Sequence, residues 1–123
     1  MSSLLMNSLQ KYSNEIKQIK QKNLNYAKEN GTKFYLGNIS ISDGIKRMGY
    51  TEDSAVIKDC IAKYINGDFG DNQHPEDIEI NKRTIATGYG DVMGEYIIDG
   101  HKIWIKTDLN ENTMTTIFLP EEW

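Results

Sequence analysis

Four residues whose side chains can bind a metal ion or transfer a proton lie within ten positions of one another in the segment NGDFGDNQHPED, residues 66–77. They are Asp68, Asp71, His74 and Asp77. Carboxylate oxygens and imidazole nitrogens are common ligands of divalent cations. The spacing, however, matches no defined calcium loop, and no cysteine or second histidine lies nearby to complete a zinc site. A small metal-dependent hydrolase or nuclease that uses Asp68, Asp71 and His74 is therefore an alternative interpretation, and we predict no catalytic residue, metal or cofactor.

The same segment can be explained as the end of one helix and the start of the next. Gly67 and Gly70 permit a positive φ, which L-residues adopt only at a cost. Asp68 and Asp71 can accept hydrogen bonds from the turn or cap the following helix. Phe69 can fill the core between the two helices. The segment is thus predicted to be a structural connection or a surface that contacts a partner.

Cysteine content and hydropathy favour a cytoplasmic protein. Cys60 is the only cysteine, so an intrachain disulfide is impossible and a reducing compartment is expected. It lies in a predicted helix without an adjacent histidine, which is typical of a buried apolar side chain rather than a nucleophile. The N-terminus lacks the pattern of a secretory signal. No apolar run approaches the roughly 20 residues that span a bilayer, so we expect no membrane association.

Charge is distributed unevenly along the chain, whose net charge is −4. Residues 1–31 carry five lysines and two glutamates, a net +3, which leaves −7 for residues 32–123. An acidic body disfavours broad binding to a phosphate backbone. It suits a protein partner with a basic surface, such as a nucleic-acid-handling protein.

The first 31 residues are predicted to form a helix with a narrow apolar seam. Steps of four and three residues relate the seam positions Leu5, Leu9, Tyr12, Ile16, Ile19, Asn23 and Tyr26. This is a heptad pattern, and Asn30-Gly31 is a typical helix end. The helix can pack on its own domain or form a homodimer through residues 4–27. In a dimer, Asn23 would fix the register. A helix-mediated oligomer that binds nucleic acid through this basic segment is a further alternative.

The rest of the chain, residues 32–123, is predicted to be a single α+β domain, in which N-terminal helices precede a three- to four-stranded antiparallel β-meander. A short strand is expected at 33–39, a turn or short helix at 40–50, and helices at 51–68 and 75–88. The second of these helices begins with Pro75, and the first would have Thr51 as its N-cap. Its expected core residues are Ala55, Val56, Cys60, Ala62 and Ile65. Strands at 91–99 and 101–108 flank Asp99-Gly100, a strong hairpin signal, and a third strand follows at 112–120.

Several short motifs resemble a widespread family of small bacterial proteins encoded on plasmids, phages and other mobile elements. The resemblance covers residues 34–123 and combines a GD[WF]GD motif, a G-K-[IL]-W-[IV]-x-T strand and a TT-x-x-x-P-E end. The matching positions are Leu36, Gly37, Gly67, Asp68, Phe69, Gly70, Asp71, Asn81, Gly88, Gly100, Lys102, Ile103, Trp104, Ile105, Thr107, Thr115, Thr116, Pro120 and Glu121. This chain departs from the pattern by having Phe69 where tryptophan is usual. The resemblance implies a role in maintaining mobile elements or in countering host defence.

Together, the acidic body and the resemblance predict a non-enzymatic counter-defence protein. The most specific form of this hypothesis is an anti-CRISPR inhibitor that covers the nucleic-acid-binding surface of an RNA-guided nuclease. The expected partner-binding residues are Asp68, Phe69, Asp71, Asp77, Glu79, Asp91 and Glu95.

Overall fold

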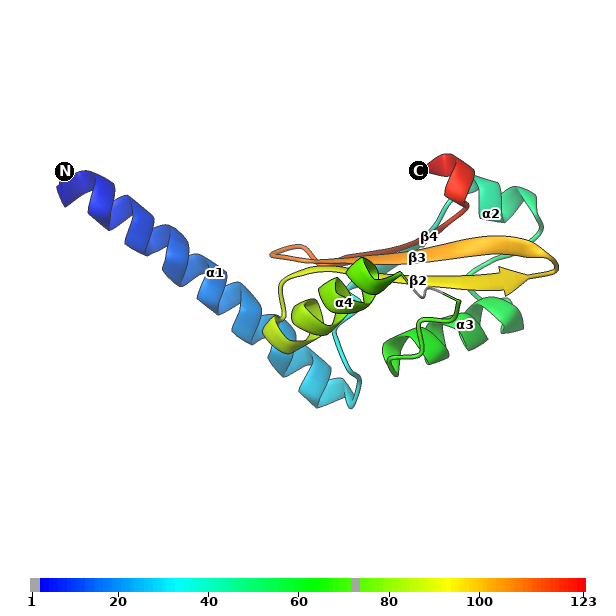
Figure 1. The fold of residues 1–123 in the computed structure, drawn as a ribbon, viewed down its shortest axis with the longest axis horizontal. Coiled ribbons are helices and arrows are strands. Elements are labelled where there is room, and N and C mark those ends of the chain that lie inside the picture. The colour runs from blue at the N-terminus through cyan, green and yellow to red at the C-terminus, as the bar shows by residue number, and fades with distance from the viewer. Residues whose placement is uncertain (1–2, 72–73) are drawn as a thin grey trace.

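A computed structural model describes residues 3–71 and 74–123, with side chains in the first helix from residue 7 onwards. The predicted α+β class is confirmed, because helices make up most of the first part of the chain and strands most of the last part (Figure 1). In chain order the elements are α1 (Ser3–Asn30), β1 (Asn38–Ile41), α2 (Asp43–Arg47), α3 (Ala55–Ile65), α4 (Pro75–Thr87), β2 (Gly90–Ile98), β3 (His101–Leu109), β4 (Met114–Phe118) and the 3₁₀ turn η1 (Pro120–Glu122).

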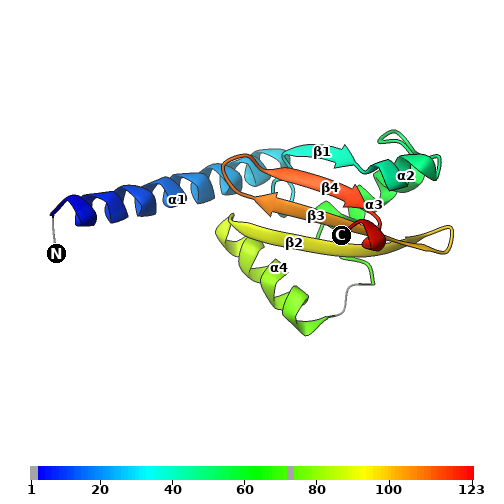
Figure 2. The same cartoon turned by 90° about the horizontal axis from the view of Figure 1, so that it is seen from above.

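The four strands form one sheet in the order β1-β4-β3-β2. The predicted hairpin at Asp99-Gly100 is confirmed, since both residues have a positive φ and β2 pairs with β3 along its whole length. In Figure 1 the sheet is seen edge-on with α3 beneath it, and Figure 2 shows α4 running beside β2 at one edge. Alternate side chains of β2, β3 and β4 point into the core, and those between them lie on a face that no long helix covers.

The purely antiparallel sheet that the sequence predicts is wrong in one detail, because β1 pairs with β4 in parallel. The first strand also begins at Asn38 rather than at residue 33. Gly37 explains the later start, since its φ of +61° interrupts an extended strand. A Cβ at Gly37 would lie 1.9 Å from Thr113 O, so the backbones meet at a distance that only glycine permits. The residues before it turn inward, and Phe34 is buried in the core.

The helix that was predicted from Thr51 starts later, at Ala55. Ser54 is its N-cap residue, and the backbone N–H of Ser54 donates to Thr51 O in a preceding turn. Its buried face consists of Ile57, Cys60 and Tyr64. The burial of Cys60 was predicted correctly. Ala55, Val56 and Ala62 were also expected in the core and are instead exposed, and Ile65 is only partly buried, because the helix turns the face of Ile57, Cys60 and Tyr64 toward the sheet.

A chain of hydroxyl groups crosses the core and joins α3 to three strands. Tyr64 Oη lies 2.8 Å from Val92 O and 2.9 Å from Thr107 Oγ1. The Thr107 hydroxyl lies 2.7 Å from Thr115 Oγ1, and Thr115 donates to Leu36 O at 2.7 Å. Burial raises the pKa of Tyr64 far above its ordinary value, so its hydroxyl remains protonated and can act as a donor. Satisfied buried polar groups of this kind rigidify a core.

The long helix α1 has two different environments. Its C-terminal half lies against the end of the sheet, where Asn23 and Ala27 are buried. Its N-terminal half projects away from the body (Figures 1 and 2). None of the helices in the described part of the chain is both long and apolar enough to cross a membrane.

The carboxylate of Glu122 fastens η1 to the start of α2. It accepts hydrogen bonds from Ser42 Oγ at 2.6 Å, from Leu119 N at 2.8 Å and from Gly44 N at 3.0 Å. The bond from Ser42 lowers the pKa of Glu122 most, and the backbone bond from Leu119 lowers it next.

We expect the stabilisation by Glu122 to disappear in acid. A lowered folded-state pKa means that the stabilisation is present above the ordinary glutamate pKa and is lost as the pH falls through the folded value. The difference in melting temperature between the natural protein and Glu122→Gln should therefore be largest at about pH 6 and should shrink as the pH falls below the ordinary glutamate pKa. A difference in melting temperature that stays constant over this range would contradict the role of the charged carboxylate.

Candidate functional site

The loop that follows α3 pairs with the edge strand of the sheet. Glu95 N donates to Phe69 O at 3.1 Å, and Asp71 N donates to Glu95 O at 2.7 Å, which makes a parallel bridge between Gly70 and Glu95. Edge strands normally leave such backbone groups open to pairing with other chains. Residues 69–71 therefore form one isolated bridge that occupies part of the open edge of β2.

The conformation of this loop confirms the turn chemistry predicted from its sequence. Gly70 has a φ of +67°, and its N–H donates to Asp68 Oδ1 at 3.1 Å. Tyr96 Oη donates to Asp68 O at 2.6 Å from the other side. The side chain of Asp71 was a second candidate for a cap, but the N-cap residue of α4 is His74. The loop thus positions the carboxylates of Asp68 and Asp71 at the surface.

Phe69 anchors the loop to the core. Its ring packs edge-on against Tyr64, with ring centroids 5.8 Å apart, and lies 6.4 Å from the ring of Phe34. The side chain is only partly buried. Aromatic packing of this kind holds the two aspartates that flank Phe69 in place.

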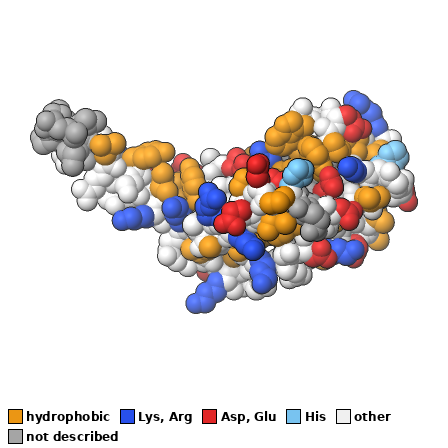
Figure 3. Space-filling view, viewed as in Figure 1, with side chains coloured by type: hydrophobic (Ala, Val, Ile, Leu, Met, Phe, Trp, Pro, Cys, Tyr) orange, Lys and Arg blue, Asp and Glu red, His pale blue; other side chains and the backbone are white. Residues whose placement is uncertain are grey.

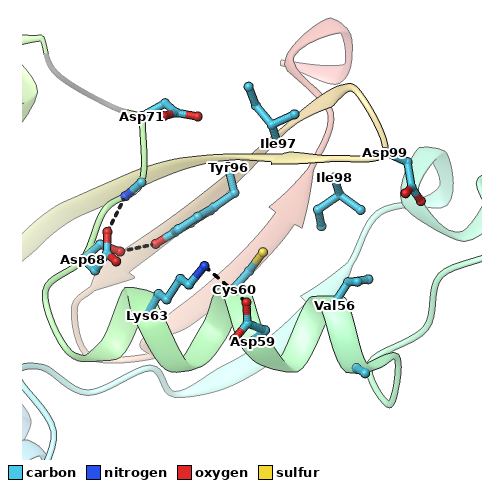
Figure 4. Close-up of a pocket in the computed structure, with 12 residues that line it drawn as sticks. Val56, Asp59, Cys60, Lys63, Asp68, Asp71, Tyr96, Ile97, Ile98 and Asp99 are labelled. Atoms are coloured by element: carbon cyan, nitrogen blue, oxygen red, sulfur yellow. Dashed lines mark hydrogen bonds and ion pairs between the residues drawn. The ribbon is translucent and has the colours of Figure 1, made fainter.

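A cleft of about 560 Å³ opens between α3 and β2, and we call it the α3–β2 cleft (Figure 4). Its lining combines apolar side chains with four aspartates and one lysine: Ala55, Val56, Asp59, Cys60, Lys63, Asp68, Gly70, Asp71, Tyr96, Ile97, Ile98 and Asp99. Figure 4 shows Tyr96 and Cys60 pointing into the space between the helix and the strand. A cleft that combines carboxylates with apolar side chains suits the side chain of a lysine or arginine. The aliphatic part of such a side chain can pack on the apolar residues while its charged end contacts the carboxylates.

The groups in this cleft are not primed for nucleophilic chemistry. Burial, followed by the nearby charge of Asp59, raises the pKa of the Cys60 thiol, and Lys63 opposes this only in part. Burial, followed by the charge of Asp68, likewise raises the pKa of Tyr96. Both groups are therefore protonated near neutral pH, and neither supplies the thiolate or phenolate that attack requires.

A second, smaller hollow of about 140 Å³ lies on the other side of the loop, and we call it the loop–α4 hollow. It is lined by Asp71, His74, Asp77, Met93, Gly94, Glu95 and Trp104. Trp104 Nε1 donates to Glu95 Oε1 at 2.9 Å. The Trp104 ring also packs edge-on against Phe118 and Trp123 on the face of the sheet that is free of long helices. Asp71 lines both hollows, so the loop joins them into one acidic surface.

No protein-family model, curated protein or solved structure matches this chain. The resemblance to proteins of mobile elements therefore stays a prediction, and the site must be judged on its own geometry.

Four of the seven residues expected to bind a partner lie together at the two hollows, namely Asp68, Asp71, Asp77 and Glu95. Phe69 supports them from within, as described above. Glu79 is exposed on α4, and Asp91 lies at the far end of β2, where its carboxylate is 4.0 Å from Lys106 Nζ. Neither of these two residues lines the hollows described here.

The structure does not support the alternative metal site. Within residues 3–71 and 74–123, no group of three or more histidine, cysteine, aspartate or glutamate side chains is arranged to hold a metal ion. Asp68 lines the α3–β2 cleft, whereas His74 lines the loop–α4 hollow on the other side of the loop. Asp71, His74 and Asp77 do line the same hollow, but among the described residues their side chains are not arranged around one point that could hold an ion.

Sequence reasoning missed the acids that other elements contribute to the cleft. Asp59 lies on α3, where it pairs with Lys63 at 3.3 Å, and Asp99 lies in the β2–β3 turn, where it accepts a hydrogen bond from the Tyr50 hydroxyl. One available signal was the helical spacing of Val56, Asp59 and Lys63, which places an apolar residue and a charged pair on one face. The position of Asp99 depends on the fold and has no local signal.

Proposed function

We propose that this protein is a non-enzymatic binding protein whose acidic surface occupies a basic, nucleic-acid-handling surface of a protein partner. The observation that carries this proposal is the composition of the two hollows. Six carboxylates line them, from Asp59, Asp68, Asp71, Asp77, Glu95 and Asp99, against a single ammonium group, that of Lys63. Lys63 pairs with Asp59, and within the described residues no ion pair neutralises the other five carboxylates, although three of them accept hydrogen bonds from uncharged groups.

Exposed ion pairs contribute only about 0–1 kcal/mol each, so charge alone does not explain tight binding. Apolar anchors are present beside the acids. Ile97 is 58% exposed and lines the α3–β2 cleft next to Val56, which is also exposed. Trp104 lines the other hollow. We therefore expect the carboxylates to steer the encounter and set its register, while the apolar groups supply most of the affinity.

The resemblance to proteins of mobile elements directs the choice of target. An RNA-guided nuclease of a CRISPR system holds its nucleic acid in a positively charged channel. We propose that such a nuclease is the partner, that the acidic surface occludes this channel, and that both proteins meet in the cytoplasm. Occlusion of this kind requires binding alone and no chemical turnover.

The test is binding to a panel of purified RNA-guided nucleases, measured at low and physiological salt, together with competition against their target DNA. Asp71→Lys should weaken binding at least about tenfold, because Asp71 lines both hollows. Glu29→Lys makes the same change in net charge at an exposed position on α1 and should change affinity less than about twofold. Equal losses in both variants would show that only net charge matters, and binding to none of the nucleases would overturn the choice of target.

A further inference from the structure

The projecting half of α1 carries apolar side chains that its own chain does not cover. Leu9 is 55% exposed and Tyr12 is 63% exposed, whereas Ile16 and Ile19 are partly buried. The stripe continues at heptad spacing into Asn23, which is 1% exposed. Figure 3 shows hydrophobic side chains along the side of this helix that faces the body. We call the space between this side of α1 and the body the notch. The seam of α1 is therefore exposed to solvent at its N-terminal end and buried in the core at its C-terminal end.

A helix that projects from the body needs to pack against another element to be stable. Isolated helices of this length are marginal in water, and most helical stability in proteins comes from packing of an apolar face. A hollow of about 520 Å³ lies where the seam meets the body, lined by Glu15, Gln18, Ile19, Lys22 and Glu111. It offers room for a further element beside α1.

The position of the body determines which element can fit. Asn23 Nδ2 donates to Gly88 O at 2.9 Å and to Asn110 O at 3.2 Å, and Lys22 Nζ donates to Glu111 O at 3.1 Å. The body thus occupies the seam from Lys22 onwards. A second α1 that ran parallel to the first would place its own C-terminal half in the space that the body fills. An antiparallel α1 avoids this clash, because its C-terminal half points away beyond the N-terminus of the first.

Charge favours the same arrangement. The helix surface from residue 7 to residue 22 carries four lysines, Lys11, Lys17, Lys20 and Lys22, against one acid, Glu15. The end of the body next to the notch carries carboxylates at Asp91, Asp108 and Glu111, and Asp91 lies opposite Asp108 in the β2–β3 register. In an antiparallel pair centred near residue 14, Lys11 of each copy lies nearest the acidic end of the other body, so this charge contact occurs twice.

We propose that two copies of this chain associate through the seam Leu9, Tyr12, Ile16 and Ile19, with their α1 helices antiparallel about a two-fold axis. Each projecting helix fills the notch of the other copy, so one interface buries both exposed stripes. This inference is independent of the proposed function. Four large apolar side chains from each copy place the contact at the lower end of stable interfaces, so we expect dissociation in the micromolar range.

The mass of the full chain in solution, measured by sedimentation from about 1 µM to about 200 µM, tests the association across the expected range of dissociation. We expect a monomer–dimer equilibrium. Tyr12→Lys should abolish the dimer, because it places a charge in the centre of the seam. Asn14→Lys adds the same charge at another exposed position, roughly on the opposite side of the helix, and should leave the dimer intact. A monomer at all concentrations, a higher oligomer, or a Tyr12→Lys dimer would overturn the proposal.

A distance between spin labels tests the orientation. A label at Lys28→Cys, in a Cys60→Ser background, lies about 14 residues from the centre of the seam. At 1.5 Å per residue the two labels of an antiparallel dimer should be about 40 Å apart. In a parallel dimer the same labels should lie within about 20 Å, and that result would overturn the antiparallel arrangement.

Discussion

Replacing Gly70 with alanine should lower the free energy of unfolding by about 2–4 kcal/mol, whereas Gly31→Ala should cost about 1 kcal/mol. The two glycines have the same φ of +67°, so the intrinsic cost of a left-handed alanine is equal at both positions. Their surroundings differ. A Cβ at Gly70 would lie 2.1 Å from Glu95 O and 2.8 Å from Tyr96 Cδ1, whereas a Cβ at Gly31 would meet no atom within 4 Å.

The difference between Gly70→Ala and Gly31→Ala measures how much the packing of the loop on β2 contributes to the free energy of unfolding. Relief of the clash requires that the loop withdraw from the strand, which breaks the bridge between Gly70 and Glu95. Urea unfolding of both variants measures the difference directly. Equal costs at the two positions would mean that residues 69–71 are not held against the edge of the sheet. Since the loop also positions Asp68 and Asp71, Gly70→Ala should weaken partner binding as well.

The sequence predicted the internal geometry of this loop but not its place in the fold. A glycine next to an aspartate indicates a turn with positive φ, and Asp68 accepts the expected hydrogen bond from Gly70 N. Docking on β2 depends instead on Glu95, which is 25 positions further along the chain. Turn chemistry is local, whereas strand pairing is decided by tertiary packing. This explains why the loop was recognised while its bridge to β2 was not.

The same distinction explains the errors in the sheet and in α3. The β2–β3 hairpin has a two-residue turn with its own sequence signal, so it was predicted. The parallel pairing of β1 with β4 joins segments more than 70 residues apart, and no local pattern marks it. In α3 two apolar faces compete, one with Val56 and one with Ile57 and Tyr64. Only contact with the sheet selects the second, which leaves Val56 exposed in the α3–β2 cleft.

The acidic surface was predicted only as far as the loop, the start of α4 and Glu95 of β2 supply it. Asp68, Asp71 and Asp77 are neighbours in sequence, and their grouping follows from a single loop and the start of α4. Asp59 and Asp99 reach the same cleft from a helix and from a hairpin turn. A cleft built from three separate elements has no signature in one stretch of sequence, so net charge and the helical spacing around Asp59 were the available indications.

Asn23→Leu should lower the free energy of unfolding by about 2–4 kcal/mol, and the sign of this change separates two explanations of the N-terminal seam. As a residue that sets register in a coiled coil, Asn23 would cost stability, and leucine would increase it. In the structure, however, the Asn23 amide donates to Gly88 O and Asn110 O, and its Oδ1 accepts from Thr113 Oγ1 at 3.2 Å. The register hypothesis is therefore wrong, because these bonds fasten α1 to its own body.

Leucine at this position keeps the apolar seam and removes every one of those hydrogen bonds. Each carbonyl group that loses its partner in a buried site costs about 1–3 kcal/mol. The sum of these costs exceeds the gain from burying one additional apolar side chain, so the net effect is a loss of stability. Asn25→Leu is the matched control, since Asn25 is exposed on the same helix and bonds only locally, to Gln21. It should change stability by less than about 0.5 kcal/mol. Chemical unfolding measures both variants at protein concentrations below and above the dissociation constant of the proposed dimer. An increase in stability for Asn23→Leu at the higher concentration would mean that the seam is held by a partner helix along its whole length rather than by the body from Lys22 onwards.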